Sequence, residues 1–315
     1  MRSENAFLQD VLDHPDDVGP RLIYADWLEE HDDAEALARA EFIRAQCELE
    51  DLPAGDRRRG PLRRRVLELL KTHRKRWTAP LREARLGKKW EFRRGFVEGV
   101  TMSATHFVGT AGRLFRLAPI RAVRCPDASN EVSALAKSPH LARLRSLDIG
   151  YMCVCGRCPI HMELRQLFAS RHVANLTTLV VSGDRISAEG ARQLAGSSRL
   201  ARLTTLDLSS NRLRTEGLRA LIDSPHLRHL KILRLGANDI APGGARGLAS
   251  WPRLSSLSEL DLRSNRIGDA GARALAESPY LSPDVRLRLS DNEISDKGVE
   301  ALRTRLGWRA AAALR

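Results

Sequence analysis

The chain has 315 residues, of which 43% are hydrophobic, so it is long enough for two or three domains with sizeable cores. No apolar run approaches the ~18 residues that a membrane-spanning helix needs, and the first residues, MRSENAFLQD, lack the apolar stretch of a secretory signal. Its five cysteines are an odd number and suggest no small disulfide framework. These features predict a cytoplasmic protein without a membrane partner.

The net charge of +13 is distributed unevenly along the chain. Residues 1–53, the acidic head, contain 15 Asp and Glu against 4 Lys and Arg, whereas residues 54–104 contain 16 Lys and Arg against 5 Asp and Glu. The remaining 211 residues contain 32 basic against 19 acidic side chains. Such asymmetry is typical of contact with nucleic acid, or of attraction between the two segments, and the sequence leaves both open.

The head is predicted to form three short helices. Asn5 is expected to cap the first helix, Pro20 to begin the second and Asp33 to cap the third. In the third helix, small and apolar residues at helical spacing predict one buried stripe. The members of this stripe are Ala36, Ala40, Ile43 and Cys47.

Part of the head also carries a resemblance to a known module. The string HPDDVGPRLIYADWLEEHDDAEALARAEFIRAQCELE resembles the repeat-companion domain, a short bacterial module that precedes or follows repeat arrays, often leucine-rich ones. The resemblance implies that a repeat array lies next to the head. It implies no chemical activity.

A basic amphipathic helix is predicted after the head, in RRRGPLRRRVLELLKTHRKRW. Its apolar stripe consists of Leu62, Val66, Leu69, Leu70 and His73. The arginines around the stripe are candidate phosphate contacts, chiefly Arg63, Arg64 and Arg65. A solvated helix face, or a partner for the acidic head, explains the same charges. The alternation in WEFRRGFVEGVTMSATHF then predicts one or two strands that adapt the chain to the next segment.

From Ile120 onward the sequence repeats, and its later units have a period of 27 residues. Each unit begins with the alternation of a short strand, continues through an Asp or Asn at a bend, and ends with helical spacing. One strand and one helix cannot bury their apolar sides alone, so the units are expected to stack. The repeating columns are Leu179, Leu206, Leu233, Leu260, Leu287; Asp184, Asn211, Asn238, Asn265, Asn292; and Gly190, Gly217, Gly244, Gly271, Gly298.

The pattern LxxLxLxxNxI resembles the leucine-rich repeat family, and the 27-residue period resembles its ribonuclease-inhibitor branch. The resemblance covers roughly Ile120 to Leu302 and implies an α/β fold. This fold is a right-handed solenoid with parallel strands on the concave side and helices on the convex side. We therefore predict a helical domain at 1–53, a basic helix and adaptor at 54–119, and a repeat solenoid with a helical C-terminal cap at 120–315.

A cysteine cluster, YMCVCGRCPIHME, lies in a gap that is five residues longer than the repeat period. Three thiolates and an imidazole within nine residues are typical ligands for a closed, structural zinc site. Cys125 of the preceding repeat is a core residue or a spare ligand. Reduced thiols in a loop, or a redox disulfide, are the alternatives. The predicted ligands are Cys153, Cys155, Cys158 and His161.

No catalytic motif appears in the sequence: there is no Walker loop, no GxSxG and no HExxH. The predicted function is a non-enzymatic scaffold that binds another protein, and the alternative is a nucleic-acid-binding accessory protein. A metal-dependent enzyme is a third class of function, and it would require a metal ion with an open coordination position. The concave candidates are Asp148, Asp207, Arg234, Asp261 and Arg288, in columns of small residues and mixed charge. The convex candidates for an anionic partner are Arg192, Arg219, Arg246 and Arg273, one per helix.

Overall fold

The computed structural model describes residues 3–31, 33–126, 128, 131–150, 160–183 and 186–307. Contacts group the chain into two compact units, Met1–Arg124 and Cys125–Arg315. The predicted segments 1–53 and 54–119 both lie within the first unit. Within the described residues, no helix has the length and apolar character that crossing a membrane requires.

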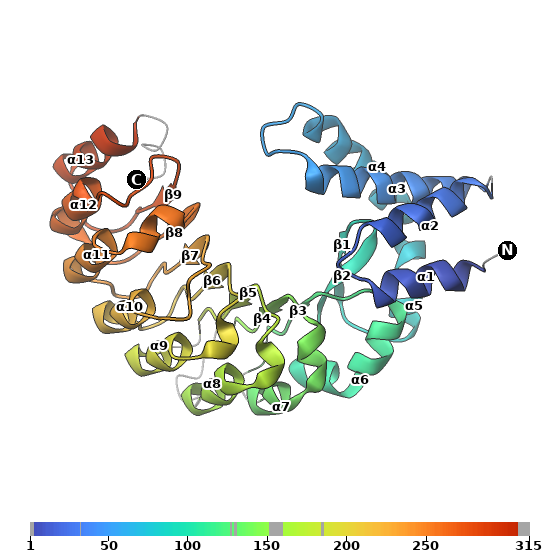
Figure 1. Ribbon diagram of the computed structural model, residues 1–315, viewed down its shortest axis with the longest axis horizontal. Helices are drawn as coiled ribbons and strands as arrows, with labels where there is room; N and C mark the ends of the chain where they lie inside the picture. The colour runs from blue at the N-terminus through green and yellow to red at the C-terminus, as the bar shows by residue number, and fades with distance from the viewer. Residues whose placement is uncertain are drawn as a thin grey trace. The chain divides into compact units, whose positions relative to one another are not determined.

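The first unit combines helices with three strands (Figure 1). Its helices are α1 (Glu4–Asp13), α2 (Gly19–Glu29), α3 (Ala34–Asp51), α4 (Arg59–Trp77), α5 (Ala79–Glu83) and α6 (Ala104–Leu117). Its strands are β1 (Lys89–Arg93), β2 (Phe96–Thr101) and β3 (Ala122–Arg124). Strand β2 pairs with β1 in antiparallel and with β3 in parallel orientation. The predicted adaptor strands are therefore β1 and β2.

The head and the basic helix share one part of the core. Phe42 and Ala45 of α3 are buried against Val66 and Leu69 of α4. The three predicted helices of the head are confirmed, and Asp33 caps α3 by accepting a hydrogen bond from the backbone N–H of Ala36. The prediction for Asn5 is wrong: α1 begins at Glu4, with Ser3 in the N-cap position, so Asn5 lies inside the helix.

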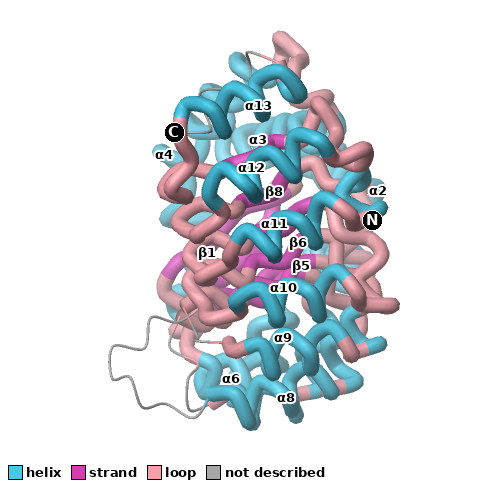
Figure 2. The backbone as a smooth tube through the Cα atoms, turned by 90° about the vertical axis from the view of Figure 1, so that its left-hand side faces the viewer, coloured by secondary structure: helices cyan, strands magenta, loops and turns pink. Residues whose placement is uncertain are grey.

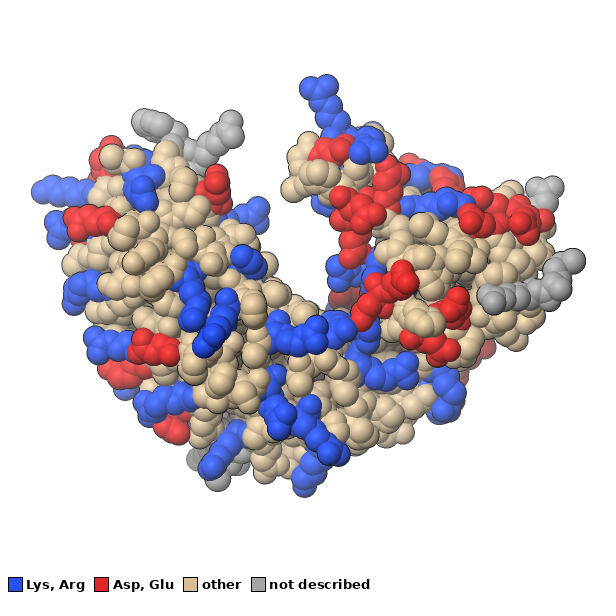
Figure 3. Space-filling model, in the orientation of Figure 1, with Lys and Arg blue, Asp and Glu red and all other residues tan. Residues whose placement is uncertain are grey.

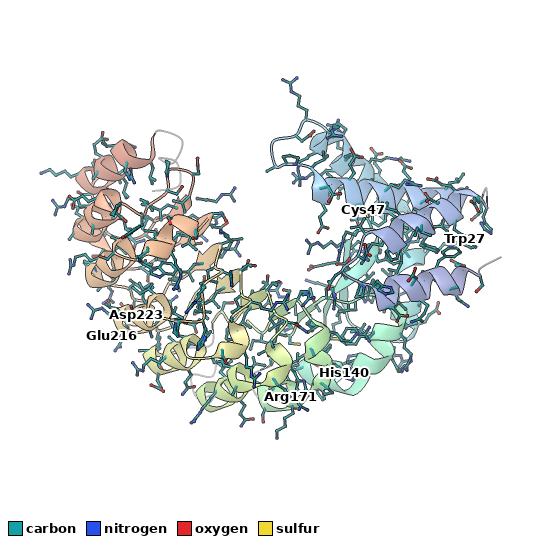
Figure 4. The ribbon with its side chains drawn as sticks, viewed as in Figure 1. Trp27, Cys47, His140, Arg171, Glu216 and Asp223 are labelled. Carbon is teal, nitrogen blue, oxygen red and sulfur yellow. The ribbon has the colours of Figure 1, made fainter. Side chains whose placement is uncertain are left out.

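The stripe on α3 is buried as predicted. Ala40, Ile43 and Cys47 pack in a cluster with residues of α1 and α2, and Ala36 lies at its edge. Cys47 is labelled in Figure 4. Burial raises the pKa of the Cys47 thiol to about 11, so this cysteine remains protonated at neutral pH as a small core residue.

The second unit is a stack of strand–helix repeats (Figure 1). Its strands are β4 (Ser146–Asp148), β5 (Thr178–Val180), β6 (Thr205–Asp207), β7 (Ile232–Arg234), β8 (Glu259–Asp261) and β9 (Arg286–Arg288). Its α-helices are α7 (Val132–Lys137), α8 (Ile160–Ala169), α9 (Ala188–Ala195), α10 (Arg214–Ile222), α11 (Pro242–Ala249), α12 (Gly268–Glu277) and α13 (Asp296–Leu306). Short 3₁₀ helices precede several strands: η1 (Pro139–Arg143), η2 (Arg171–Val173), η3 (Ser198–Leu200) and η4 (Pro252–Ser256).

The strands of this unit pair in parallel with the predicted register. Leu179 lies opposite Leu206, and Leu233 lies between Leu206 and Leu260. The helices lie side by side, in chain order, on the other side of the sheet (Figure 2). The α/β solenoid is thus confirmed, with strands on the inner side of the stack and helices on the outer side (Figure 1).

The buried asparagine column joins each repeat to the one before it. The Asn265 side-chain amide donates hydrogen bonds to the carbonyls of Leu262 in its own repeat and Leu235 in the preceding repeat. Its Oδ1 accepts the backbone N–H groups of Asn238 and Ile240, both at 3.0 Å. An unpaired buried amide would cost free energy, and the Asn265 amide finds all its partners only when neighbouring repeats stack. This side chain therefore stabilises the stacking. Comparable links are made by Asn211, Asn238 and Asn292.

Candidate functional site

The concave strand face holds all five residues predicted there, one on each of five strands. Asp148 ends β4, Asp207 ends β6, Arg234 ends β7, Asp261 ends β8 and Arg288 ends β9. The strand register places Arg234 between Asp207 and Asp261, and Asp261 next to Arg288. Charges of opposite sign therefore alternate across the last four strands.

The aspartates of this face accept backbone hydrogen bonds that stabilise local turns. Asp148 and Asp207 each accept the backbone N–H two residues further on, from Gly150 and Ser209, both at 2.9 Å. Asp261 accepts the corresponding bond from Arg263 at 3.1 Å. An Asp in this position closes a local turn at the end of its strand. These carboxylates therefore shape the turns and are partly used before any partner arrives.

A cluster of ion pairs occupies β7–β9 and the turn after β8. The guanidinium of Arg234 donates from Nε to Oε1 of Glu259 at 2.8 Å, and Arg263 donates from Nη2 to Oδ2 of Asp261 at 2.6 Å. Arg286 lies 3.9 Å from Glu259. Sequence reasoning placed Glu259, Arg263 and Arg286 in columns of mixed charge and did not select them. Their proximity depends on strand register and side-chain direction.

Burial separates the two signs of charge in this cluster. The side chains of Asp261 and Glu259 are only 2% and 9% exposed, whereas those of Arg286 and Arg263 are 67% and 48% exposed. Because an enclosed carboxylate is covered by the guanidinium that pairs with it, solvent meets mainly the arginines. We call Arg234, Arg263, Arg286 and Arg288 the arginine patch. Three carboxylates, those of Asp207, Glu259 and Asp261, pair with these four arginines, so the patch has an excess of one positive charge.

The pKa values in the cluster follow from the same geometry. Burial by itself would raise the pKa of Asp261, but hydrogen bonds from the side chain and backbone of Arg263 bring it below its ordinary value. The hydrogen bond to Glu259 holds the pKa of Arg234 above its ordinary value. Both groups are therefore charged at neutral pH, and the patch is a permanently ionic surface.

The convex arginines recur as predicted on the exposed outer face of successive helices, with Arg192 on α9, Arg219 on α10, Arg246 on α11 and Arg273 on α12. Acidic side chains interrupt them. Arg192 pairs with Glu189 at 2.8 Å. In Figure 3 blue and red groups alternate along the helix side of the repeats, and Figure 4 labels Glu216 and Asp223 on and just after α10. This surface has no single sign of charge.

Arg63, Arg64 and Arg65 lie on the exposed surface of α4. Arg65 donates to both carboxylate oxygens of Glu41 on α3, which confirms that the basic helix packs on the acidic head. Arg63 and Arg64 have no ion pair within the described part of the chain.

The predicted zinc ligands cannot be placed together. Cys153, Cys155 and Cys158 lie outside the described residues, and His161 belongs to α8 without a described side chain. Cys125, considered as a spare ligand, is completely buried, and burial raises the pKa of its thiol to about 12. Within the described residues, no group of three His, Cys, Asp or Glu side chains is suited to hold a metal ion. The zinc site stays a prediction.

Comparisons with known proteins agree with this architecture. The family model described as "Leucine Rich repeat" matches residues 202–221, 226–249, 253–276 and 285–302. No curated protein matches the chain.

Two solved structures are similar to parts of the chain. An internalin from Listeria monocytogenes is 17% identical, with a TM-score of 0.35, over 59% of this chain and 60% of that one. TLR13, solved in the TLR13–ssRNA13 complex, is 20% identical, with a TM-score of 0.30, over 58% of this chain and 31% of that one. The chain thus spans less than two thirds of either structure's length. From the matched segments, the repeat period and the stacked strand–helix units, residues 202–302 of the chain are leucine-rich repeats.

Proposed function

We propose that the chain is a non-enzymatic scaffold that binds another protein through the concave strand face of its repeats, with the arginine patch as the contact. Leucine-rich repeat proteins generally mediate protein interactions, and solenoids commonly bind along the concave surface. The observation that supports the patch is the burial of Glu259 and Asp261 beneath exposed guanidiniums.

The partner segment is expected to be acidic. Each guanidinium has five N–H donors, and the pairs within the cluster use only some of them. The remaining donors of Arg263 and Arg286 face solvent, where a carboxylate of a partner can accept them. The patch also has no ring for stacking bases, because no aromatic residue occurs in β7–β9. An acidic polypeptide therefore fits this surface better than a single-stranded nucleic acid.

The test is binding of a labelled oligoglutamate peptide to the intact chain, followed by fluorescence anisotropy over a range of salt concentrations. We expect Arg263→Ala combined with Arg286→Ala to weaken binding several-fold, because both removed guanidiniums are exposed. Arg219→Ala combined with Arg246→Ala is the matched control, since it removes the same charge from the convex helices. Equal losses from the two double variants would contradict a concave site.

Nucleic-acid binding is the second candidate, supported by the exposed and unpaired positions of Arg63 and Arg64 within the described part of the chain. In this alternative the basic helix and the convex arginines follow a phosphate backbone. The alternation of acidic and basic groups on the convex side opposes it, because phosphates need a surface of one sign. Tight, salt-dependent binding of duplex DNA by the intact chain, lost on Arg63→Glu with Arg64→Glu, would favour this candidate over the scaffold.

A further inference from the structure

A largely enclosed cation that forms no ion pair with the described residues lies in the first unit. The guanidinium of Arg39 on α3 lies 4.7 Å from the ring centre of Trp77, 5.1 Å from that of Phe96, and 5.8 Å from those of Phe42 and Phe92. Its Nη1 is enclosed and has no hydrogen-bond partner. Across the residues that the structure describes, the Arg39 side chain makes no ion pair. This arrangement differs from Arg21, whose buried guanidinium pairs with Glu98.

The cost of this arrangement is visible in its acid–base behaviour. Removal from water lowers the pKa of Arg39 to about 10. The guanidinium therefore stays charged at neutral pH, but its charged form is less stable than that of an arginine in water. The faces of the four rings compensate partly, since each attracts a cation through its quadrupole. The enclosed Nη1, however, still lacks an acceptor, and a ligand anion would supply one.

A cavity of about 440 Å³ opens next to Arg39. This volume lies within the range of small-molecule sites. Half of its lining is apolar or aromatic, with Tyr24 and Trp27 of α2 stacked at 6.0 Å and Trp77 of α4 on another side. The other half is polar or charged and includes a second cation, Arg76. Trp27 is labelled in Figure 4. The apolar part of a ligand, whether flat or aliphatic, can therefore pack against these rings while the charged end of the ligand faces Arg39.

The carboxylates beside the cavity are already used by this chain. Glu35 accepts a hydrogen bond from Nε1 of Trp77 at 2.8 Å and lies 2.8 Å from Nδ1 of His73. Glu4 accepts the hydroxyl of Tyr24 at 2.8 Å. Asp33 also lines the cavity and caps α3. Within the described chain none of the three forms an ion pair with Arg39, although the negative charge of Glu35 favours its charged form. Their negative charge still acts across the cavity, so it disfavours an anion of charge two and leaves a single carboxylate as the suitable group.

We infer that this cavity is a binding site for a monocarboxylate with an apolar body, held by Arg39 and packed between Trp27 and Trp77. The carboxylate can belong to a free small molecule or to the C-terminus of a polypeptide, because both present the same group. The site is independent of the concave strand face and does not rest on the function proposed for it.

The experiment uses the full chain and two probes, phenylacetate and a short peptide that ends in phenylalanine with a free carboxylate. Their neutral counterparts, phenylacetamide and the amidated peptide, report the contribution of the charge. Binding is measured by calorimetry, with tryptophan fluorescence as a second readout, because Trp27 and Trp77 line the cavity. We expect at least one carboxylate to bind at least about tenfold more tightly than its amide, since a charge-assisted pair is lost in the amide.

Two variants separate binding from folding. Arg39→Met removes the charge but keeps an unbranched side chain, and it should abolish the preference for the carboxylate over its amide. Thermal stability should stay the same or rise, because an unpaired buried cation is removed. Arg63→Met, at an exposed position on α4, is the matched control and should leave binding unchanged.

Each result is decisive. A preference for phenylacetate identifies a small-molecule site, and a preference for the free-ended peptide alone identifies a site for a polypeptide terminus. Equal affinity for acid and amide, unchanged binding by Arg39→Met, or no binding of either carboxylate at about millimolar concentration would overturn the inference. If Arg39→Met fails to fold, Arg39→Lys replaces it: the charge is kept, the two-pronged geometry is lost, and affinity should fall.

Discussion

Arg65 on α4 donates hydrogen bonds from Nε and Nη2 to the two carboxylate oxygens of Glu41 on α3, at 2.5 and 2.6 Å. This two-pronged pair joins the basic helix to the acidic head. The hydrogen bond from Arg65 lowers the pKa of Glu41, so the pair stays intact at neutral pH. A central arginine of the basic run is thus engaged inside its own unit.

The first prediction is that the intact chain binds duplex DNA weakly at physiological salt, with a shallow dependence on salt concentration. Glu41→Gln should release Arg65 for a phosphate and steepen the slope of log K against log[salt] by up to about one. Glu68→Gln is the control, because Glu68 makes only a longer contact of 3.4 Å with Arg65. The slope of each protein is measured by anisotropy. A steep slope for the unchanged chain would contradict the prediction.

The second prediction concerns a buried charge cluster in the first unit. Glu98 on β2 accepts hydrogen bonds from Arg21 at 2.6 Å and from Arg94 at 3.0 and 2.9 Å, and all three side chains are buried. Glu98→Ala leaves the buried guanidinium of Arg21 without its anion and that of Arg94 with only a longer contact of 3.8 Å to Glu50. The free energy of unfolding should fall by about 3–5 kcal/mol, measured by urea denaturation with tryptophan fluorescence.

The matched control for Glu98 is Glu68→Ala, whose side chain is 65% exposed. It should change the free energy of unfolding by less than about 1 kcal/mol, because water screens a surface ion pair. Similar losses for Glu98→Ala and Glu68→Ala would show that burial does not govern this cluster.

The third prediction tests why glycine recurs in every repeat. A Cβ on Gly271 of α12 would lie 2.5 Å from Cγ2 of Ile267 and 2.8 Å from Cβ of Ala245 on α11. Neighbouring helices pack too closely here for a methyl group, so Gly271→Ala should lower the free energy of unfolding by about 1–3 kcal/mol. Gly243→Ala on α11 meets only ordinary contacts of 3.7 and 3.8 Å and should raise it by up to about 1 kcal/mol. Thermal and urea melts compare the two; equal shifts would rule out close packing as the cause.

The fourth prediction concerns the cysteine cluster. If Cys153, Cys155, Cys158 and His161 hold zinc, protein purified without chelator should contain about one equivalent of the metal. Cys158→Ser should lose it, whereas Cys47→Ala should keep it, because Cys47 is buried in the core of the first unit. Elemental analysis of the three proteins gives the answer, and zinc-free unchanged protein would refute the site.

The sequence by itself determined the repeat architecture. A leucine on one side of a short strand must be buried, and with a fixed period of 27 residues the only way to bury every such residue is to stack the units in register. The strand pairing of Leu206, Leu233 and Leu260 followed from this constraint. The helices of the head followed from local signals as well, chiefly the cap at Asp33 and the apolar spacing along α3.

Only the tertiary structure decided how the charges are used. In the sequence, Glu259 and Arg286 belong to a column of mixed sign, but packing buries the carboxylate and leaves the guanidinium exposed. Likewise Arg39 resembles any other arginine in a charged helix, until rings from α4, β1 and β2 surround it and no carboxylate of the described chain forms an ion pair with it. Burial and pairing depend on contacts between residues far apart in the chain, and hydrophobic periodicity does not encode which charged side chains meet across them.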